Sequence, residues 1–234
     1  MIAGRGGACL FIYAKSENNL MSGILTSATI FQGKRTAYIA LGSNLASVFG
    51  GPPETIRAAV ERLSGLGRIT AQSSLYETDP VGFHGQPAFS NAVVALETQL
   101  EPTGLLQGML VIEREFGRRR SGAIPNGPRT LDLDLLLIDD LTIASEELTV
   151  PHPALAERRF VLQPLDEIAP QLRHPVLRQT VRELLTLLPD SGENRISGIR
   201  QIEGTKGESE MRGPGNEPGV EAALDRSCPP DTII

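Results

Sequence analysis

The chain has 234 residues, of which 40% are hydrophobic and 21% are charged, so we expect one compact domain with a substantial core. The formal net charge of -6 excludes a general polyanion binder, because affinity for nucleic acid rests mainly on basic residues that neutralise phosphates. The only cysteines, Cys9 and Cys228, do not support a disulfide framework or a zinc cluster, which favours the reducing cytoplasm.

The composition divides the chain into three regions. Residues 36–189 carry the periodic patterns of helices and strands. The leader, residues 1–35, has no convincing element, and we expect it to be disordered or to precede a true start at Met21; a secretory signal is the alternative. Its apolar run is shorter than the roughly 18 residues that span a bilayer, so we expect no membrane segment. Residues 190–234 are rich in Gly, Pro, Glu and Ser, and we expect them to be mostly disordered.

The first patterned elements are a strand and a helix. Residues 36–41 form a short apolar run typical of a strand, which ends at the turn-like sequence of residues 42–44. Pro52 and Pro53 then begin a helix for which Gly67 is the expected C-terminal glycine. Apolar residues recur on one side of this helix, namely Ile56, Ala59, Val60 and Leu63.

Two strands, a helix and a fourth strand follow. Residues 69–76 and 88–96 are extended runs separated by a loop too long for a tight hairpin. A second helix begins at Pro102 and stops at Gly117, and residues 131–138 form the fourth strand. The apolar stripe of the second helix consists of Leu105, Met109, Ile112 and Phe116.

The order β-α-β-β-α-β indicates an α+β protein: a ferredoxin-like sandwich in which both helices cover one face of an antiparallel sheet. Extra C-terminal elements follow, including an amphipathic stretch at residues 176–188. Many functions share this fold, so the function must come from the site.

Two aspartates alternate with leucines on the fourth predicted strand. Because strand side chains point to opposite faces in turn, Asp132 and Asp134 share one face and lie about 6 to 7 Å apart. Two carboxylates held that close are well explained by a hard cation such as Mg²⁺ between them. The alternative is a pair of solvated aspartates on an exposed sheet face.

Arginines gather before this strand. Arg118, Arg119 and Arg120 follow the glycine that ends the second helix, and Arg129 comes three residues before Asp132. Guanidinium groups match phosphate oxygens, so the segment predicts a site for polyphosphate and metal. The alternative is a solvated charge run that pairs with Glu113 and Glu115. The phosphate-binding motif G-x-x-x-x-G-K-[ST] does not occur, so arginines and metal must hold the phosphates.

The third predicted strand places Phe89 and Asn91 on one face, where a flat heteroaromatic could stack on the ring while the amide binds its edge. The alternative is a core phenylalanine with a sheet-capping asparagine. Further along, His152 precedes Arg158 and could donate to a phosphate or an adenine, or could be a surface turn residue between prolines.

Four segments in this order resemble the 6-hydroxymethyl-7,8-dihydropterin pyrophosphokinases of folate biosynthesis. They read AYIALGSNL, YETDPVGFHGQPAFSNAVVALET, GRRR followed by GPRTLDLDLLL, and VPHPALAERRFVLQPLDEIAP. The resemblance covers most of residues 37–170. It implies a ferredoxin-like core that transfers the β,γ-diphosphate of ATP to the pterin hydroxymethyl oxygen and releases AMP, with two Mg²⁺ ions.

The resemblance also implies roles for individual residues. Asp132 and Asp134 match the metal-binding pair. The positions that match ATP contacts are Glu113, Arg118, Arg120, Arg129, His152 and Arg158. The catalytic positions are the two aspartates together with Arg118, Arg120 and Arg129. The positions that match the pterin pocket are Thr78, Val81, Phe89, Asn91 and Phe160. The implied partners are therefore the small molecules ATP and the dihydropterin, and we expect a cytoplasmic monomer with no nucleic-acid or membrane partner.

The chain departs from the family pattern at three places. It has Pro125-Asn126 where a tryptophan often precedes the Gly-Pro-Arg, Pro153 where an aromatic can occur, and Glu147 where an arginine can occur. The leader and tail have no counterpart in the pattern.

Two other functions share some of these features. An RNA-recognition domain has the same strand order, but it would carry an aromatic-rich third strand that is missing here. A nucleotide-sugar transferase with a D-x-D metal site would need a longer nucleotide-binding domain.

Overall fold

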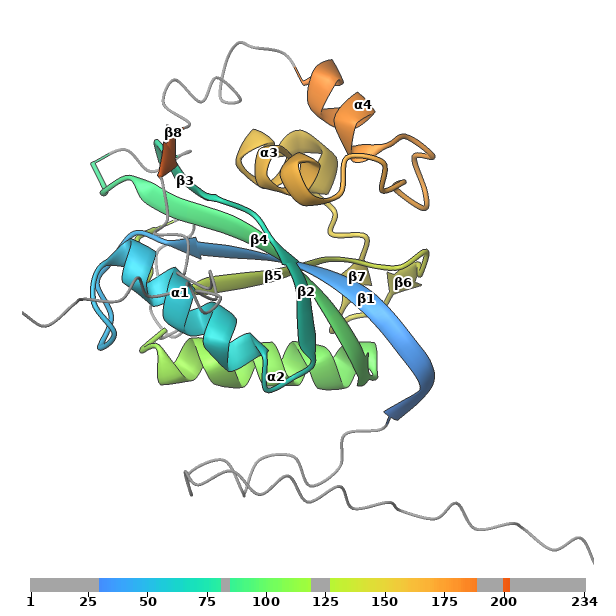
Figure 1. Cartoon of the computed structure of the whole chain (residues 1–234), viewed down its shortest axis with the longest axis horizontal. Coiled ribbons are helices and arrows are strands. Elements are labelled where there is room, and N and C mark those ends of the chain that lie inside the picture. Colours follow the sequence, from blue (N-terminus) through green and yellow to red (C-terminus); the bar gives the residue numbers. More distant parts are fainter. Residues whose placement is uncertain (1–29, 81–84, 119–126, 189–199, 203–234) are drawn as a thin grey trace, which may run out of the picture. The chain divides into compact units, whose positions relative to one another are not determined.

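The computed structural model describes residues 30–80, 85–118, 127–188 and 200–202 (Figure 1). Cys9 and Cys228 lie outside the described residues. Pairing between strands is antiparallel throughout the main sheet. The strands of this sheet, in spatial order, are β5 (Asp132–Ile138), β1 (Ile30–Ser43), β4 (Phe89–Leu100), β3 (Leu75–Thr78) and β8 (Arg200–Ile202), while β2 (Arg68–Gln72) pairs with another part of β4.

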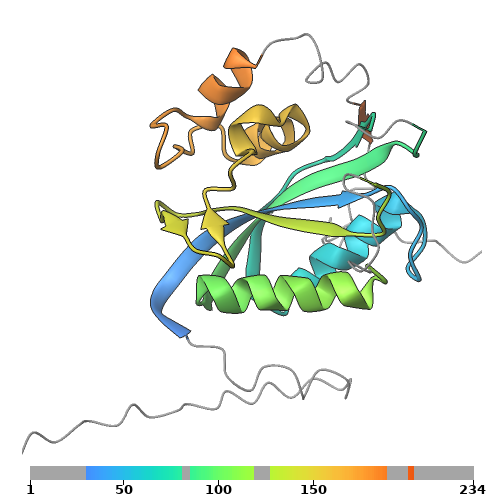
Figure 2. The same ribbon diagram turned by 180° about the vertical axis from the view of Figure 1, so that it is seen from behind.

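One face of this sheet is covered by α1 (Pro52–Leu63) and α2 (Pro102–Glu115), as the sequence predicted (Figures 1 and 2). The predicted stripes of both helices enter the core beneath them, together with the leucines that alternate with the aspartates of β5. α2 ends where expected, because Gly117 adopts a left-handed conformation with a φ of 81° that glycine accommodates without strain. The predicted ferredoxin-like arrangement is confirmed.

The opposite face of the sheet is covered by α3 (Arg159–Ile168) and α4 (Val181–Leu187) (Figures 1 and 2). Val161, Leu162 and Leu165 of α3 pack with Val93 of β4 in a second core. α4 begins later than the predicted amphipathic stretch because Thr180 forms a capping box with Glu183. The short 3-10 helix η1 (Leu155–Glu157) precedes α3, and a two-stranded sheet of β6 (Ile143–Ala144) and β7 (Thr149–Val150) follows β5. Both faces of β4 are therefore buried.

The predicted strand at residues 69–76 is two strands, β2 and β3, and Ser73 lies at the break. Its amide donates to the carbonyl oxygen of Val93 (2.9 Å), and its Oγ accepts from the Val93 amide (2.9 Å). A side-chain oxygen thus replaces a backbone acceptor in the ladder, which lets β3 leave the line of β2 while both pair with β4.

The prediction for Gly67 was wrong, because α1 ends at Leu63 and Gly67 is outside the helix. A Cβ atom on Gly67 would lie 2.4 Å from the carbonyl oxygen of Glu97. Close approach to β4, and not helix termination, requires glycine here.

β1 and β8 extend beyond the patterned region that the sequence indicated. β1 begins at Ile30, inside the expected leader, and β8 lies inside the expected tail and pairs with β3.

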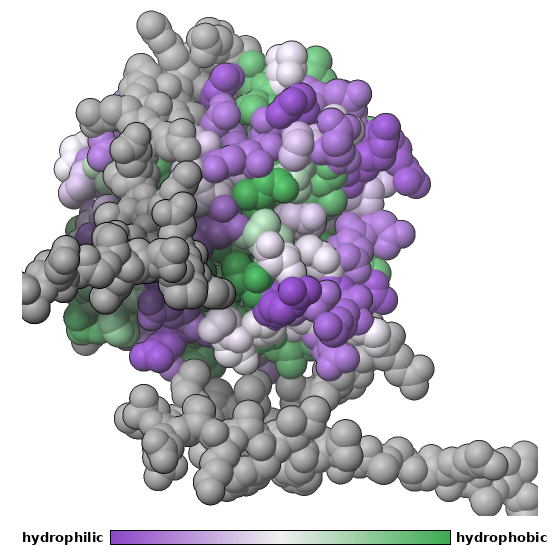
Figure 3. Space-filling view, viewed as in Figure 1, coloured by the Kyte–Doolittle hydropathy of each residue, from purple (hydrophilic) through white to green (hydrophobic). Residues whose placement is uncertain are grey.

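Hydrophilic side chains cover much of the face in Figure 3, with apolar side chains in small groups between them. None of the helices in the described ranges is long and apolar enough to cross a membrane.

Candidate active site

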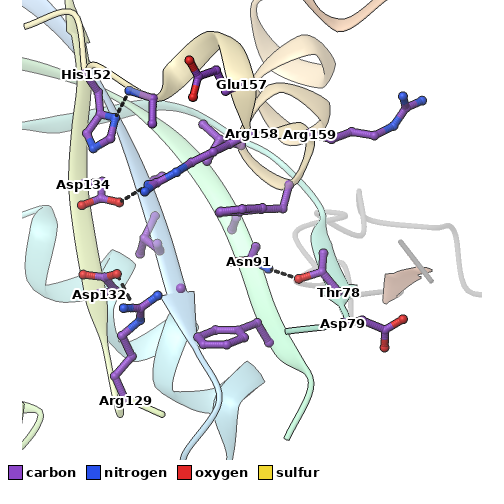
Figure 4. Close-up of a pocket in the computed structure, with 18 of the residues that line it drawn as sticks. Thr78, Asp79, Asn91, Arg129, Asp132, Asp134, His152, Glu157, Arg158 and Arg159 are labelled. Atoms are coloured by element: carbon purple, nitrogen blue, oxygen red, sulfur yellow. Dashed lines mark hydrogen bonds and ion pairs between the residues drawn. The ribbon is translucent and has the colours of Figure 1, made fainter. Parts of the chain in front are cut away.

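A cavity of about 650 Å³ lies between the sheet and the segment that leads into α3 (Figure 4). It is on the face opposite α1 and α2. Small residues of β1 form part of its floor, and charged side chains from four segments surround it. The lining residues are Ala40, Leu41, Gly42, Thr78, Asp79, Phe89, Asn91, Ala92, Arg118, Arg129, Asp132, Asp134, His152, Ala154, Glu157, Arg158, Arg159, Phe160 and Val161.

The two aspartates of β5 point into this cavity, as the alternation predicted (Figure 4). Both are partly buried, whereas the leucines between and after them face the core beneath α2. Burial raises the pKa of Asp134, and the negative charge of Asp132 raises it further. The two carboxylates therefore repel each other in a partly buried place, and a cation between them would relieve this repulsion.

Three arginines from separate segments pair with these carboxylates. The guanidinium of Arg118 bridges Asp132 and Glu113. Nε of Arg129 lies 3.1 Å from Oδ2 of Asp132, and Arg158 reaches Oδ2 of Asp134 at 3.5 Å. The contact between Nε of Arg129 and Asp132 is an ion pair without hydrogen-bond geometry, and within the described residues this buried nitrogen has no hydrogen-bond acceptor. The guanidinium of Arg129 lines the cavity, so its other nitrogens are placed to bind an anion such as a phosphate oxygen.

Two aromatic rings lie on the other side of the cavity, each beneath an arginine. The guanidinium carbon of Arg129 is 5.2 Å from the ring centre of Phe89, and that of Arg158 is 5.8 Å from the ring centre of Phe160. Arg129 and Arg158 thus contact both a carboxylate and a ring. The charged and the aromatic parts of the site are one connected group of side chains.

Asn91 lies deep in the cavity and is fixed by Thr78. Its Nδ2 donates to Oγ1 of Thr78 (2.8 Å), a contact drawn in Figure 4. Its Oδ1 lies beside Gly42, where a Cβ atom would be 3.2 Å away. The amide is therefore held in one orientation next to a position that has no side chain, which leaves space for a planar group at its edge.

His152 borders the carboxylate side of the cavity. The amide of Ala154 donates to its Nδ1 (3.1 Å), so the neutral ring carries its proton on Nε2. Burial lowers the pKa of His152, although the negative charge of Asp134 opposes this effect. His152 is thus suited to donate a hydrogen bond from Nε2 while uncharged.

The structure does not bring every predicted residue into the cavity. Glu113 is only 2% exposed and does not line it; its Oε1 accepts from the Leu133 amide (2.9 Å) and from Arg118. Its contacts hold the arginine and the strand that carries the aspartates. Val81, Arg119 and Arg120 lie outside the described residues.

Several lining residues were not predicted from the sequence: Asp79, Glu157, Arg159, Ala40 and Gly42. The last two enter because β1 pairs in register with β5, which places Gly42 opposite Asp132 and Ala40 opposite Asp134. Glu157 and Arg159 adjoin the predicted Arg158, and in Figure 4 the side chain of Arg159 extends away from the aspartates. Only the strand register could have identified the β1 positions.

Asn44 lies outside the cavity and holds two of its bordering segments together, although the sequence suggested only a turn at this position. It is 2% exposed, and its Oδ1 accepts from the backbone amide of Arg129 (2.8 Å). Its Nδ2 donates to Gln86 (3.0 Å) and to the carbonyl oxygen of Pro87 (3.1 Å). Asn44 thus fixes Arg129 relative to the segment that leads to Phe89.

The carboxylate pair fits a hard cation. Within the described ranges, no group of three or more Asp, Glu, His or Cys side chains could hold a metal ion. An ion at Asp132 and Asp134 would complete its coordination with phosphate oxygens and water, which is the usual environment of Mg²⁺. The raised pKa of Asp134 supports this fit, because a nearby cation stabilises the ionised carboxylate.

Comparisons with known proteins relate most of the described chain to one enzyme family. The family model of the 7,8-dihydro-6-hydroxymethylpterin-pyrophosphokinases (HPPK) matches residues 38–170. The 2-amino-4-hydroxy-6-hydroxymethyldihydropteridine pyrophosphokinase of Pseudomonas aeruginosa is 45% identical over 163 residues, which are 69% of this chain and 96% of that protein. Folic acid synthesis protein fol1 of Schizosaccharomyces pombe is 40% identical over 158 residues, which are 68% of this chain but only 21% of that much longer protein.

A solved structure of Plasmodium falciparum HPPK-DHPS with pterin and p-hydroxybenzoate has the same fold. It matches with a TM-score of 0.51 and 18% identity, and the match covers 67% of this chain and 42% of that one. At this identity the likeness concerns the fold alone. The family match, by contrast, covers more than half of the chain, including Asp132, Asp134, Phe89 and Phe160. The chain belongs to the 7,8-dihydro-6-hydroxymethylpterin-pyrophosphokinase family.

Proposed function

We propose that the chain transfers diphosphate from ATP to the hydroxymethyl group of 6-hydroxymethyl-7,8-dihydropterin, giving the pterin diphosphate and AMP in folate biosynthesis. The observation that carries this proposal is one cavity with two chemically different halves. Asp132 and Asp134 with their arginines suit a polyphosphate, and Phe89 and Phe160 suit a flat ring. Membership of the pyrophosphokinase family supports the same reaction.

The transfer forms a bond between the hydroxymethyl oxygen and the β-phosphorus of ATP. The bond from the β-phosphorus to the oxygen that bridges to the α-phosphorus breaks, AMP leaves with that oxygen, and the hydroxyl proton is released. Such a reaction depends mainly on positioning and on neutralising charge. Arg129 would bind phosphate through its guanidinium, which lines the cavity, and Arg118 and Arg158 would exchange carboxylate for phosphate oxygens.

Asp132 and Asp134 would hold Mg²⁺, two ions in our proposal, which would neutralise charge on the phosphate oxygens during transfer. His152 would donate from Nε2 to the nucleotide. Glu113, which the resemblance placed near adenine, would act through Arg118 and the β5 backbone.

The pterin ring would lie between Phe89 and Phe160, with the fixed amide of Asn91 at its edge and Thr78 beside that amide. Val81 would border the same pocket, and Arg120 would contact ATP, as the resemblance implies for these two positions. We further propose that the enzyme works as a monomer in the cytoplasm.

The decisive experiment is to incubate purified protein with Mg-ATP and the dihydropterin alcohol and to identify the nucleotide product. We expect AMP that depends on both the pterin and Mg²⁺. Pterin-dependent ADP, or no nucleotide turnover, would contradict the proposal. Family membership does not favour the RNA-binding alternative or the nucleotide-sugar transferase; RNA retained on a filter at physiological salt would be needed to revive the former.

A further inference from the structure

The carboxylate of Glu167, near the end of α3, binds three donors from the start of β3. The backbone amide of Ser74 lies 3.1 and 3.0 Å from its two oxygens. The Ser74 hydroxyl donates to Oε1 (2.8 Å), and the Tyr76 hydroxyl donates to Oε2 (2.8 Å). These contacts form a clamp, which we call the Glu167 clamp, between a helix and a strand that are far apart in the sequence.

The position of Glu167 on its helix is otherwise unfavourable. A carboxylate in the last turn of a helix opposes the helix dipole, and α3 has no basic residue in that turn to offset it. The hydrogen bonds from Ser74 and Tyr76 compensate for this. Tyr76 is only 8% exposed, and burial followed by the hydrogen bond to Glu167 raises its pKa. The tyrosine therefore stays protonated and remains a donor to the carboxylate.

The clamp lies on the helix face that also carries Phe160. Residues 160 and 167 are separated by about two turns of a helix with 3.6 residues per turn, so they share one stripe of α3. On β3, alternation places Tyr76 and Thr78 on one face, and they pair directly with Asn91 and Phe89 of β4. One end of the contact between α3 and β3 is thus the clamp, and the other end is the aromatic pocket.

We propose that Glu167 is a positioning residue for the pterin: the clamp fixes α3 against β3 and thereby sets the position of Phe160 above Phe89 and Asn91. This inference rests on the proposed function. α3 also packs on the sheet through buried apolar residues, so it stays attached without the clamp. The clamp adds a directional restraint. Hydrogen bonds depend on direction, so they fix the position of α3 along its axis relative to β3, whereas apolar contacts are not directional.

The test compares Glu167→Ala, Glu167→Gln and Tyr76→Phe in steady-state assays that vary pterin and ATP separately. For Glu167→Ala we expect the KM for pterin to rise roughly fivefold to tenfold, the size of one weakened stacking contact. The KM for ATP and the kcat at saturating pterin should change less than about twofold. Glu167→Gln should recover part of the effect, because its carbonyl oxygen still accepts a hydrogen bond. Tyr76→Phe removes one donor and keeps the test available if the alanine variant does not fold.

Asp166 provides a matched control. It is the neighbouring carboxylate on α3, but it binds Arg182 of α4 at 3.0 and 3.1 Å and not the strand. Asp166→Ala should leave the KM for pterin unchanged. A pterin KM that is unchanged in Glu167→Ala, or that rises equally in Asp166→Ala, would overturn the positioning role. Absence of pterin-dependent AMP in the unmodified protein would instead overturn the proposed function.

Discussion

Asp132 raises the pKa of Asp134 from two residues away on the same face of β5, an effect second only to burial. The two carboxylates are not equally compensated. Asp132 contacts both Arg118 and Arg129, whereas Asp134 has Arg158 at 3.5 Å. Asp134 is therefore the carboxylate whose ionised form a cation would stabilise most. Binding of metal and substrate would relieve the repulsion between the two carboxylates.

Replacing either aspartate should separate activity from stability. We expect Asp132→Asn and Asp134→Asn each to lower kcat/KM by about a hundredfold or more, because in the proposed reaction these carboxylates hold the cation that neutralises the phosphate oxygens. Asp134→Asn should also raise the free energy of unfolding by up to about 1 kcal/mol, since it removes a destabilised carboxylate. AMP formation and urea denaturation measure the two effects.

Phe89→Ala is the comparison for these variants. It should mainly raise the KM for pterin and leave kcat within about tenfold, because it removes stacking and not charge. Equal and small losses from the aspartate and phenylalanine variants would contradict the assignment of the two halves of the cavity.

Glu113 should be important for stability as well as for activity. Glu113→Ala leaves the Leu133 amide and Arg118 without this partner in a buried position, and we expect a loss of about 3 kcal/mol in the free energy of unfolding. Glu115→Ala on the same helix is the control, since its ion pair with Arg62, at 3.5 Å, is near the surface and should contribute less than about 1 kcal/mol. Equal midpoints in urea would show that Glu113 is not a structural anchor.

Replacing Gly42 should weaken the binding of pterin more than the binding of ATP. A Cβ atom in Gly42→Ala would lie 3.2 Å from Oδ1 of Asn91, so the amide must shift. We expect the KM for pterin to rise roughly threefold to tenfold, with little change for ATP. Gly65→Ala introduces an equally close contact, 3.2 Å from the Arg62 carbonyl oxygen, but outside the cavity. The same kinetic change in both variants would argue against a local effect on Asn91.

His174 should make stability depend on pH. Its Nδ1 accepts from the amides of Val176 (3.3 Å) and Leu177 (3.1 Å), and burial lowers its pKa from 6.5. Because the folded state binds the proton less tightly than the unfolded state, this contribution is complete above pH 6.5 and is lost as the pH falls through the lowered pKa.

His174→Asn keeps a side-chain acceptor but does not titrate. Urea midpoints measured between about pH 7.5 and 5.5 should fall more steeply for the unmodified protein than for this variant. Parallel curves would show that other groups control the acid sensitivity.

Local patterns predicted much of the fold. The apolar stripes of α1 and α2 and the alternation on β5 indicate which side of each element is apolar. In each case that side faces the core, as predicted. The break at Ser73 and the reason for Gly67 could not be predicted, because each depends on an atom of β4 that only strand pairing brings near. α4 was placed too early because the capping box at Thr180 was not recognised.

The sequence by itself determined that Asp132 and Asp134 share a face, that Arg129 lies near them, and that the segments occur in the family's order, since these properties depend on alternation and short spacing. The tertiary structure decided which arginine reaches which carboxylate, that Glu113 is buried behind the site, and that Glu167 binds Tyr76. Those contacts join residues from different elements, and side-chain partners across a fold depend on strand register and helix packing that no local pattern contains.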